Sequence, residues 1–120
     1  MGKFSSLESE GFAVAAALQQ LAGSEKLYLS VITKFCNMYD KLPETIQADL
    51  QNAAFDKVQR DAHTIKGLAG TIGHAALREQ AERLEHAASQ ADAQACEAAL
   101  AAFRPIFDAV MTALQAVINV

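Results

Sequence analysis

One stretch of the chain, residues 58–73, has a helical pattern with two unlike faces. Apolar side chains recur at i, i+4, i+7, i+11 and i+14, which is typical of a helix that buries one side. These side chains are Val58, Ala62, Ile65, Ala69 and Ile72. His63, Lys66, Gly67 and Gly70 recur at i, i+3, i+4 and i+7 on the opposite side. We therefore predict a helix that packs on the core and exposes a histidine.

The two glycines on the histidine face need a physical reason. A glycine in a helix interior costs about 0.5–1 kcal/mol relative to alanine. Gly67 and Gly70 both lie within two turns of His63, on its own side of the helix. We infer that something large approaches the imidazole and that side chains at these positions would obstruct it.

Helical signals dominate the whole chain and predict an all-α fold. Alanine is abundant, prolines are limited to Pro43 and Pro105, and β-branched alternation is missing. We expect helices over residues 12–22, 24–42, 44–53, 55–72, 75–89 and 92–118, with Pro105 kinking or dividing the last. In the first of these helices we expect Ala15 to face inward, and in the second we expect Met38 to belong to a wide apolar stripe. Short connections between long amphipathic helices predict an antiparallel up-and-down four-helix bundle with short additional N-terminal helices. Residues 1–10 are polar and predicted to be a flexible N-terminus, and residues 11–120 a single bundle domain.

Composition narrows the class of protein further. The chain has 120 residues, of which 52% are hydrophobic, enough for one core that buries its own stripes, so we expect a monomer. The net charge of −4 without a basic patch argues against nucleic-acid binding. No run of about 18 apolar residues is present, so we expect no membrane insertion. Cys36 and Cys96 lack motif spacing, which favours free thiols in the cytoplasm.

An exposed histidine such as His63 can be surface decoration, a metal ligand, a general base or a nucleophile. The three histidines form no i, i+4 ligand pair, so we predict no metal site. A face cleared by glycines is flat and offers no substrate pocket for a general base. Nucleophilic attack on a phosphoryl group brought by a partner protein fits better, and Lys66, one turn along, is placed to offset the phosphoryl charge.

The spacing His63-x-x-Lys66-Gly67, followed by Gly73, resembles the signature of histidine-containing phosphotransfer (HPt) domains of two-component phosphorelays. The similarity spans about residues 11–90. Its other residues are Gly11-Phe12, Ala17-Leu18, Leu21, Gly23, Leu27-Tyr28 and Phe35 before the histidine, and Leu77, Ala81, Leu84 and Glu85 after it. Leu68 departs from the small residue common at its position, which bears on receiver preference rather than on the chemistry.

The resemblance implies a phosphorelay intermediate. His63 would accept a phosphoryl group from the aspartyl phosphate of a response-regulator receiver domain and pass it to another receiver aspartate. Receivers, or a hybrid histidine kinase, would be the partners, and the receiver would supply Mg²⁺. The chain would then be a phosphocarrier with no cofactor and no ATP-dependent kinase activity of its own. Nothing in the chain matches a nucleotide-binding motif, in agreement with this.

The resemblance also assigns roles around His63. Gly67, Gly70 and Thr71, with residues of the helix over 24–42, would form the receiver docking face. Glu85 lies where the family often carries a polar group beside the histidine, and such an acceptor would fix the imidazole tautomer. A solvated Glu85 on the helix surface is an equally good interpretation of the sequence. We interpret His74 as a loop or helix-start residue and His86 as a surface residue.

Two other functions are compatible with the same sequence. The chain could be the phosphorylatable domain of a chemotaxis-type histidine kinase, which carries a similar motif. It could also be a helical binding or sequestering module whose histidine is never phosphorylated.

Overall fold

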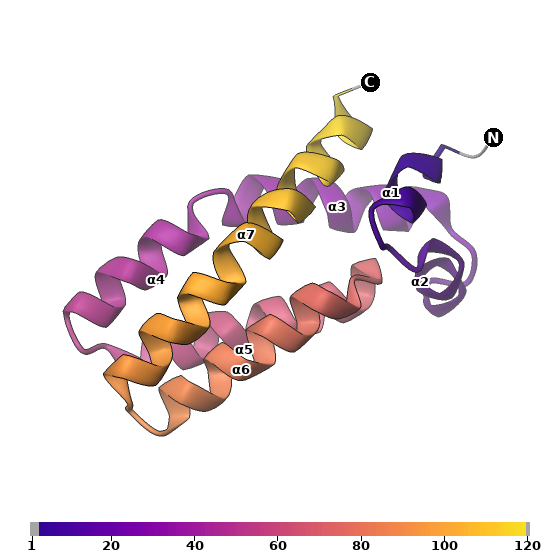
Figure 1. Cartoon of the computed structure of the whole chain (residues 1–120). Coiled ribbons are helices and arrows are strands. Elements are labelled where there is room, and N and C mark those ends of the chain that lie inside the picture. Colours follow the sequence, from indigo (N-terminus) through magenta and orange to yellow (C-terminus); the bar gives the residue numbers. More distant parts are fainter. Residues whose placement is uncertain (1–2, 120) are drawn as a thin grey trace.

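The computed structural model describes residues 3–119, which fold into seven helices and contain no strand (Figure 1). The helices are α1 (Ser5–Ser9), α2 (Val14–Gln20), α3 (Glu25–Tyr39), α4 (Leu42–Gln51), α5 (Phe55–Ile72), α6 (Ala75–Ser89) and α7 (Ala93–Ile118). The predicted all-α class is therefore confirmed. The molecule is elongated, with principal extents of 45 × 24 × 20 Å.

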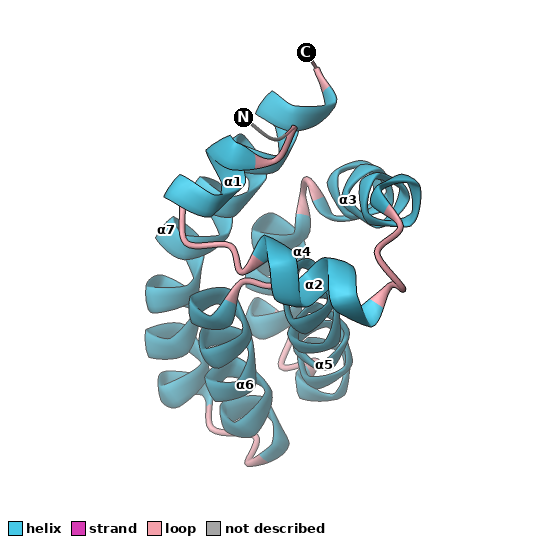
Figure 2. Cartoon of the chain, turned by 90° about the vertical axis from the view of Figure 1, so that its right-hand side faces the viewer, coloured by secondary structure: helices cyan, strands magenta, loops and turns pink. Residues whose placement is uncertain are grey.

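The longest helices contact one another through α6 and α7. α6 packs against both α5 and α7, and α7 also contacts α3 and α4 (Figure 1). α4 packs on α5, while the short helices α1 and α2 contact α7 and α5. In Figure 2, α2 lies across the end of the molecule at which α5 stops and α6 begins.

Helix α5 has the amphipathic pattern predicted from the sequence. Its observed bounds, Phe55–Ile72, match the predicted range. All five stripe residues are buried, namely Val58, Ala62, Ile65, Ala69 and Ile72. Because the stripe faces the core, the opposite face that carries His63 is turned outward.

The turn after α5 is fixed by contacts from two other parts of the chain. Gly73 has φ of +86°, and its carbonyl accepts a hydrogen bond of 2.8 Å from the Ala13 amide before α2. The Tyr28 hydroxyl of α3 donates to the Ile72 carbonyl at 2.8 Å in a buried position. Burial raises the pKa of Tyr28 to about 12, so the phenol stays a donor. The end of α5 is thus tied to both α2 and α3.

His74 begins α6, as the sequence analysis predicts. Its Nδ1 accepts a hydrogen bond of 3.1 Å from the Leu77 amide, the usual role of an N-cap side chain. The ring lies edge-on to Phe12, with centroids 4.7 Å apart, and it is buried. This burial lowers the pKa of His74 below its usual value of 6.5.

The N-terminal segment differs from the prediction. Residues 1–10 were expected to be flexible, but Ser5–Ser9 form α1, and Phe4 and Leu7 are buried in the core. The Phe4 ring meets the Tyr28 ring edge-on at 5.0 Å. Two large apolar residues three positions apart lie on one helix face, and this signal is weak in a short polar segment. Met1 and Gly2 lie outside the described residues.

Two further local predictions were wrong, and a third was wrong in part. The helix expected over 12–22 is shorter, and Val14 and Ala17 are buried in place of Ala15, which is exposed. Met38 was assigned to the core stripe of α3, yet 67% of it is exposed. Of the two effects expected of Pro105, division of the last helix is not observed, because Pro105 lies on the exposed side of α7, where water can reach the carbonyl that loses its partner.

Helix α7 is the one described helix long and apolar enough to cross a membrane by length and composition, with a mean hydropathy of 1.3 over 18 residues. This is weak evidence, because core helices of soluble proteins pass the same test. The buried side chains of α7 are Cys96, Leu100, Phe103, Phe107, Val110, Met111 and Leu114. Much of its remaining apolar character comes from exposed alanines such as Ala98, Ala101 and Ala102.

Replacing Gly73 by alanine should destabilise the fold. A Cβ at this position would lie 2.8 Å from the Ala13 carbonyl oxygen, and the backbone is left-handed. We expect a loss of about 1–3 kcal/mol in the free energy of unfolding, measured by urea denaturation. Gly67→Ala is the matched control, because a Cβ there meets no atom within 4 Å, and it should add about 0.5–1 kcal/mol. Equal stability of the two variants would contradict the structure.

Stability should depend on pH through His74. The folded-state pKa is depressed, so the unfolded chain binds the proton first as the pH falls. Stability is therefore complete above the usual pKa of 6.5 and declines as the pH drops from there toward the folded-state pKa. Asparagine is a good N-cap residue that does not titrate, so His74→Asn should flatten this decline in urea midpoints measured between about pH 7 and pH 5. If the urea midpoints of His74→Asn fell with pH as steeply as those of the wild type, the pH dependence of stability would arise from a group other than His74.

Candidate functional site

Helices α5 and α6 bring three polar side chains together at the surface. The Nδ1 atom of His63 lies 2.7 Å from Oε2 of Glu85, and Nζ of Lys66 lies 2.7 Å from Oε1 of the same carboxylate. The His63 side chain is 68% exposed, whereas Lys66 and Glu85 are only 24% and 18% exposed. One carboxylate on α6 therefore joins two residues of α5 and leaves the imidazole open to the solvent.

Close packing of the two helices allows this bridge. α5 and α6 contact each other more extensively than any other pair of described helices. Alanines occupy several of their buried positions, and small side chains let helix axes approach. These alanines are Ala62 and Ala69 on α5 and Ala81, Ala87 and Ala88 on α6.

The electrostatics of Glu85 keep it charged. The hydrogen bond from Lys66 is the largest cause that lowers the pKa of Glu85, and the hydrogen bond from His63 adds to it, while partial burial opposes both. A carboxylate only accepts hydrogen bonds, so the proton of a neutral imidazole is drawn to Nδ1. The lone pair of the neutral ring then lies on Nε2, the nitrogen that Glu85 does not hold.

The sequence left two interpretations of Glu85 open, a contact with the imidazole and a solvated surface residue, and in the structure the carboxylate contacts the imidazole directly. Lys66 differs from the free phosphoryl-binding cation that the sequence suggests, because its ammonium group is already bound to Glu85. An ammonium has three donors, so two remain after this contact. Lys66 is held beside the ring rather than extended into the solvent.

The two glycines have unlike surroundings. A Cβ at Gly67 would meet no atom within 4 Å, so this part of the face is open. A Cβ at Gly70 would lie 3.8 Å from Cδ and Nε of Arg78, whose side chain runs across it. The Thr71 hydroxyl donates to the Gly67 carbonyl at 3.2 Å, so it is engaged with its own helix. Arg78 was not predicted to lie at this face, although it precedes Glu85 by seven residues on the same side of α6.

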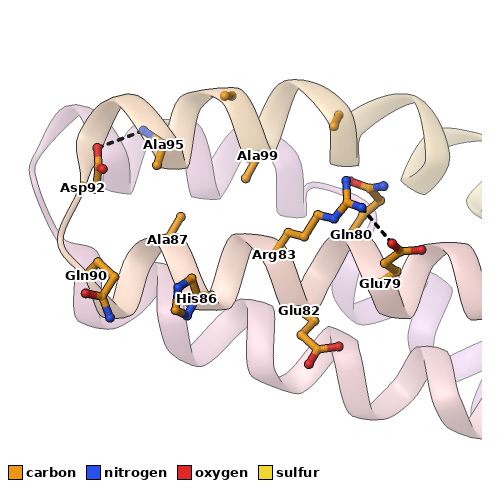
Figure 3. Close-up of a pocket in the computed structure, with 12 residues that line it drawn as sticks. Glu79, Gln80, Glu82, Arg83, His86, Ala87, Gln90, Asp92, Ala95 and Ala99 are labelled. Carbon is orange, nitrogen blue, oxygen red and sulfur yellow. Dashed lines mark hydrogen bonds and ion pairs between the residues drawn. The ribbon is translucent and has the colours of Figure 1, made fainter.

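A groove of about 970 Å³ lies between α6 and α7 (Figure 3). Charged and polar residues line its α6 side, and among them Arg83 pairs with Glu79 at 2.8 Å. The α7 side is lined by Ala95, Ala98, Ala99 and Ala102. His86 lies in this groove, and none of the three residues of the His63 cluster does. Within residues 3–119, no group of three or more His, Cys, Asp or Glu residues could hold a metal ion.

The family model of the Hpt domain matches residues 30–119, so the chain belongs to the Hpt domain family, as the sequence motif predicts. Hpt domains act in histidine phosphotransfer and interact with receiver domains and histidine kinases in phosphorelays. No curated protein and no solved structure matched the chain.

The His63–Glu85 contact predicts one imidazole tautomer. In ¹⁵N NMR spectra recorded where the ring is neutral, we expect His63 to carry its proton on Nδ1. Glu85→Ala removes the acceptor, so a substantial fraction of the rings should move the proton to Nε2. Glu82→Ala, an exposed carboxylate on the same helix without a contact to His63, is the control. If wild type and Glu85→Ala gave the same tautomer ratio, the contact would have no influence on the ring.

Proposed function

We propose that His63 accepts a phosphoryl group from the aspartyl phosphate of a receiver domain and passes it to an aspartate of another receiver. The observation that carries this proposal is the hydrogen bond of 2.7 Å between Nδ1 of His63 and Glu85 on a ring that is 68% exposed. It leaves Nε2 as the accessible nucleophile. Membership of the Hpt family supports the same chemistry.

In the transfer step, the Nε2 lone pair attacks phosphorus while the bond from phosphorus to the aspartate oxygen breaks. The aspartate leaves as a carboxylate, and the phosphorylated ring keeps its proton on Nδ1 and becomes cationic. Glu85 accepts that proton's hydrogen bond and offsets the new charge. Transfer to the second receiver reverses these events. The receiver would supply Mg²⁺, and this chain contributes the positioned ring.

Lys66 would offset the charge of the phosphoryl oxygens. Its ammonium group is held by Glu85 at 2.7 Å and retains donors for a second acceptor. An oriented cation at a site of developing negative charge needs little reorganisation, which favours the transition state. We propose that Gly67, Gly70 and Thr71 lie within the surface that the receiver covers.

We interpret α3, α5, α6 and α7 as the antiparallel up-and-down four-helix frame that carries this site, with α1, α2 and α4 as the additional short helices. The frame would act as a single-domain monomer. Cys36 and Cys96 are free and buried, and burial raises the pKa of both thiols, which suits a reducing cytoplasm.

The direct test is to mix the protein with phosphorylated receiver domains and Mg²⁺ and to follow acid-labile phosphate on the chain. Wild type should be labelled, and His63→Gln should not. Failure with a full panel of receivers from the same organism would contradict the proposal, as would label that survives His63→Gln. Label that needs ATP and a chemotaxis-type kinase domain would favour that alternative, and no label from either source would favour a binding module.

The transfer rate should also depend on the two residues beside His63. Glu85→Ala and Lys66→Ala should each slow transfer by about tenfold or more, equivalent to ~1.4 kcal/mol in activation free energy. Rapid-quench measurements at saturating receiver would give this rate. Glu82→Ala, which changes the same charge on the same helix, should transfer like wild type. Wild-type rates in the Glu85 and Lys66 variants would remove both residues from the mechanism.

A further inference from the structure

A second cation lies over the helix face that carries His63. The side chain of Arg78, on α6, runs across Gly70, with Cδ and Nε 3.8 Å from the position of a Cβ at that glycine. Gly70 follows His63 by seven residues, which places it about 10 Å further along α5. Arg78 therefore belongs to the surface around the imidazole but lies too far along to contact a phosphoryl group on Nε2 directly.

The charge of Arg78 is not matched within the described chain. Arg83 pairs with Glu79 and Arg104 with Glu44, whereas no carboxylate of residues 3–119 lies within 4.0 Å of the Arg78 guanidinium. The nearby Lys66 is neutralised by Glu85. Arg78 is exposed, so its guanidinium is available to a partner.

The Arg78 side chain passes close to Gly70. An alanine at position 70 would make an ordinary contact with Arg78 at 3.8 Å, and a larger residue would displace it. The absence of a side chain at Gly70 leaves space on α5 beside Cδ and Nε of Arg78, so the arginine can lie along this face of the helix. Gly67 lies between His63 and Gly70 on α5, and a Cβ there would meet no atom within 4 Å, so a partner protein can approach this part of the helix.

We propose that Arg78 is a docking residue that selects among receivers by pairing with an acidic side chain on the receiver surface beside the phosphoaspartate. The inference rests on the proposed function, since it names a feature of the partner that docks at the same site. A planar guanidinium matches a carboxylate by two parallel hydrogen bonds, and a charge pair at the rim of an interface steers encounter and discriminates between partners.

The test measures transfer from a phosphorylated receiver at several receiver concentrations and ionic strengths. Arg78→Glu should raise the half-saturating receiver concentration by about tenfold and reduce its salt dependence, while the loss of rate at saturation stays small. Arg83→Glu is the matched control, since it makes the same charge change on α6 but lies in the groove toward α7. Its half-saturating concentration should change by less than about twofold.

A charge swap completes the experiment. Acidic residues around the receiver's phosphoaspartate are changed singly to lysine, and one of them should restore tight docking of the Arg78→Glu variant. Labelling by phosphoramidate, a small phosphodonor that needs no docking, reports whether His63 and the fold are intact in each variant.

The outcomes separate the two proposals. If wild type transfers and Arg78→Glu has the same half-saturating concentration, Arg78 only covers Gly70, and the inference is overturned while the proposed function stands. The same holds if Arg78→Glu fails in phosphoramidate labelling and Arg78→Gln, a neutral replacement that keeps the arm, docks like wild type. A wild-type protein that takes no phosphoryl group from any receiver overturns both.

Discussion

The contacts of the Glu85 carboxylate hold the residues of the candidate site together. Its two oxygens lie 2.7 Å from Nδ1 of His63 and 2.7 Å from Nζ of Lys66, so a single group on α6 joins the imidazole and the ammonium group of α5. Such a bridge requires α5 and α6 to lie at a fixed separation and register. The alanine-rich contact between them and the buried stripe of α5 provide both, and the core thereby positions the surface chemistry.

Much of this could be predicted from the sequence because the relevant signals are periodic. The stripe from Val58 to Ile72 gave the bounds of α5 and its buried face, and Gly73 gave its end. The candidate partner of His63 was predicted only through resemblance, because no local pattern relates residues 63 and 85. Their contact arises from how α5 and α6 pack, and the sequence left a solvated Glu85 equally acceptable.

The errors have a common physical origin. Phe4 and Leu7 bury against residues distant in the chain, and a segment of five helical residues has too little periodicity to reveal this. Met38 was assigned to the core by its position beside a wide stripe, but α3 has neighbours on only part of its circumference. The proximity of the Arg78 side chain to Gly70 depends on the separation of α5 and α6, which a single sequence does not specify. The bounds and the buried face of a long periodic helix such as α5 can thus be predicted from the sequence, whereas the contacts between helices cannot.

The hydrogen bonds at the end of α5 also show that residues before the matched region contribute to the fold. The family match starts at residue 30, inside α3, yet the Ile72 carbonyl is bonded by Tyr28 and the Gly73 carbonyl by the Ala13 amide. A chain trimmed to the matched region would leave both carbonyls without these donors and expose the Phe12 side of His74. The segment before the matched region therefore supplies hydrogen-bond donors and an aromatic contact to the end of the histidine helix and the start of α6.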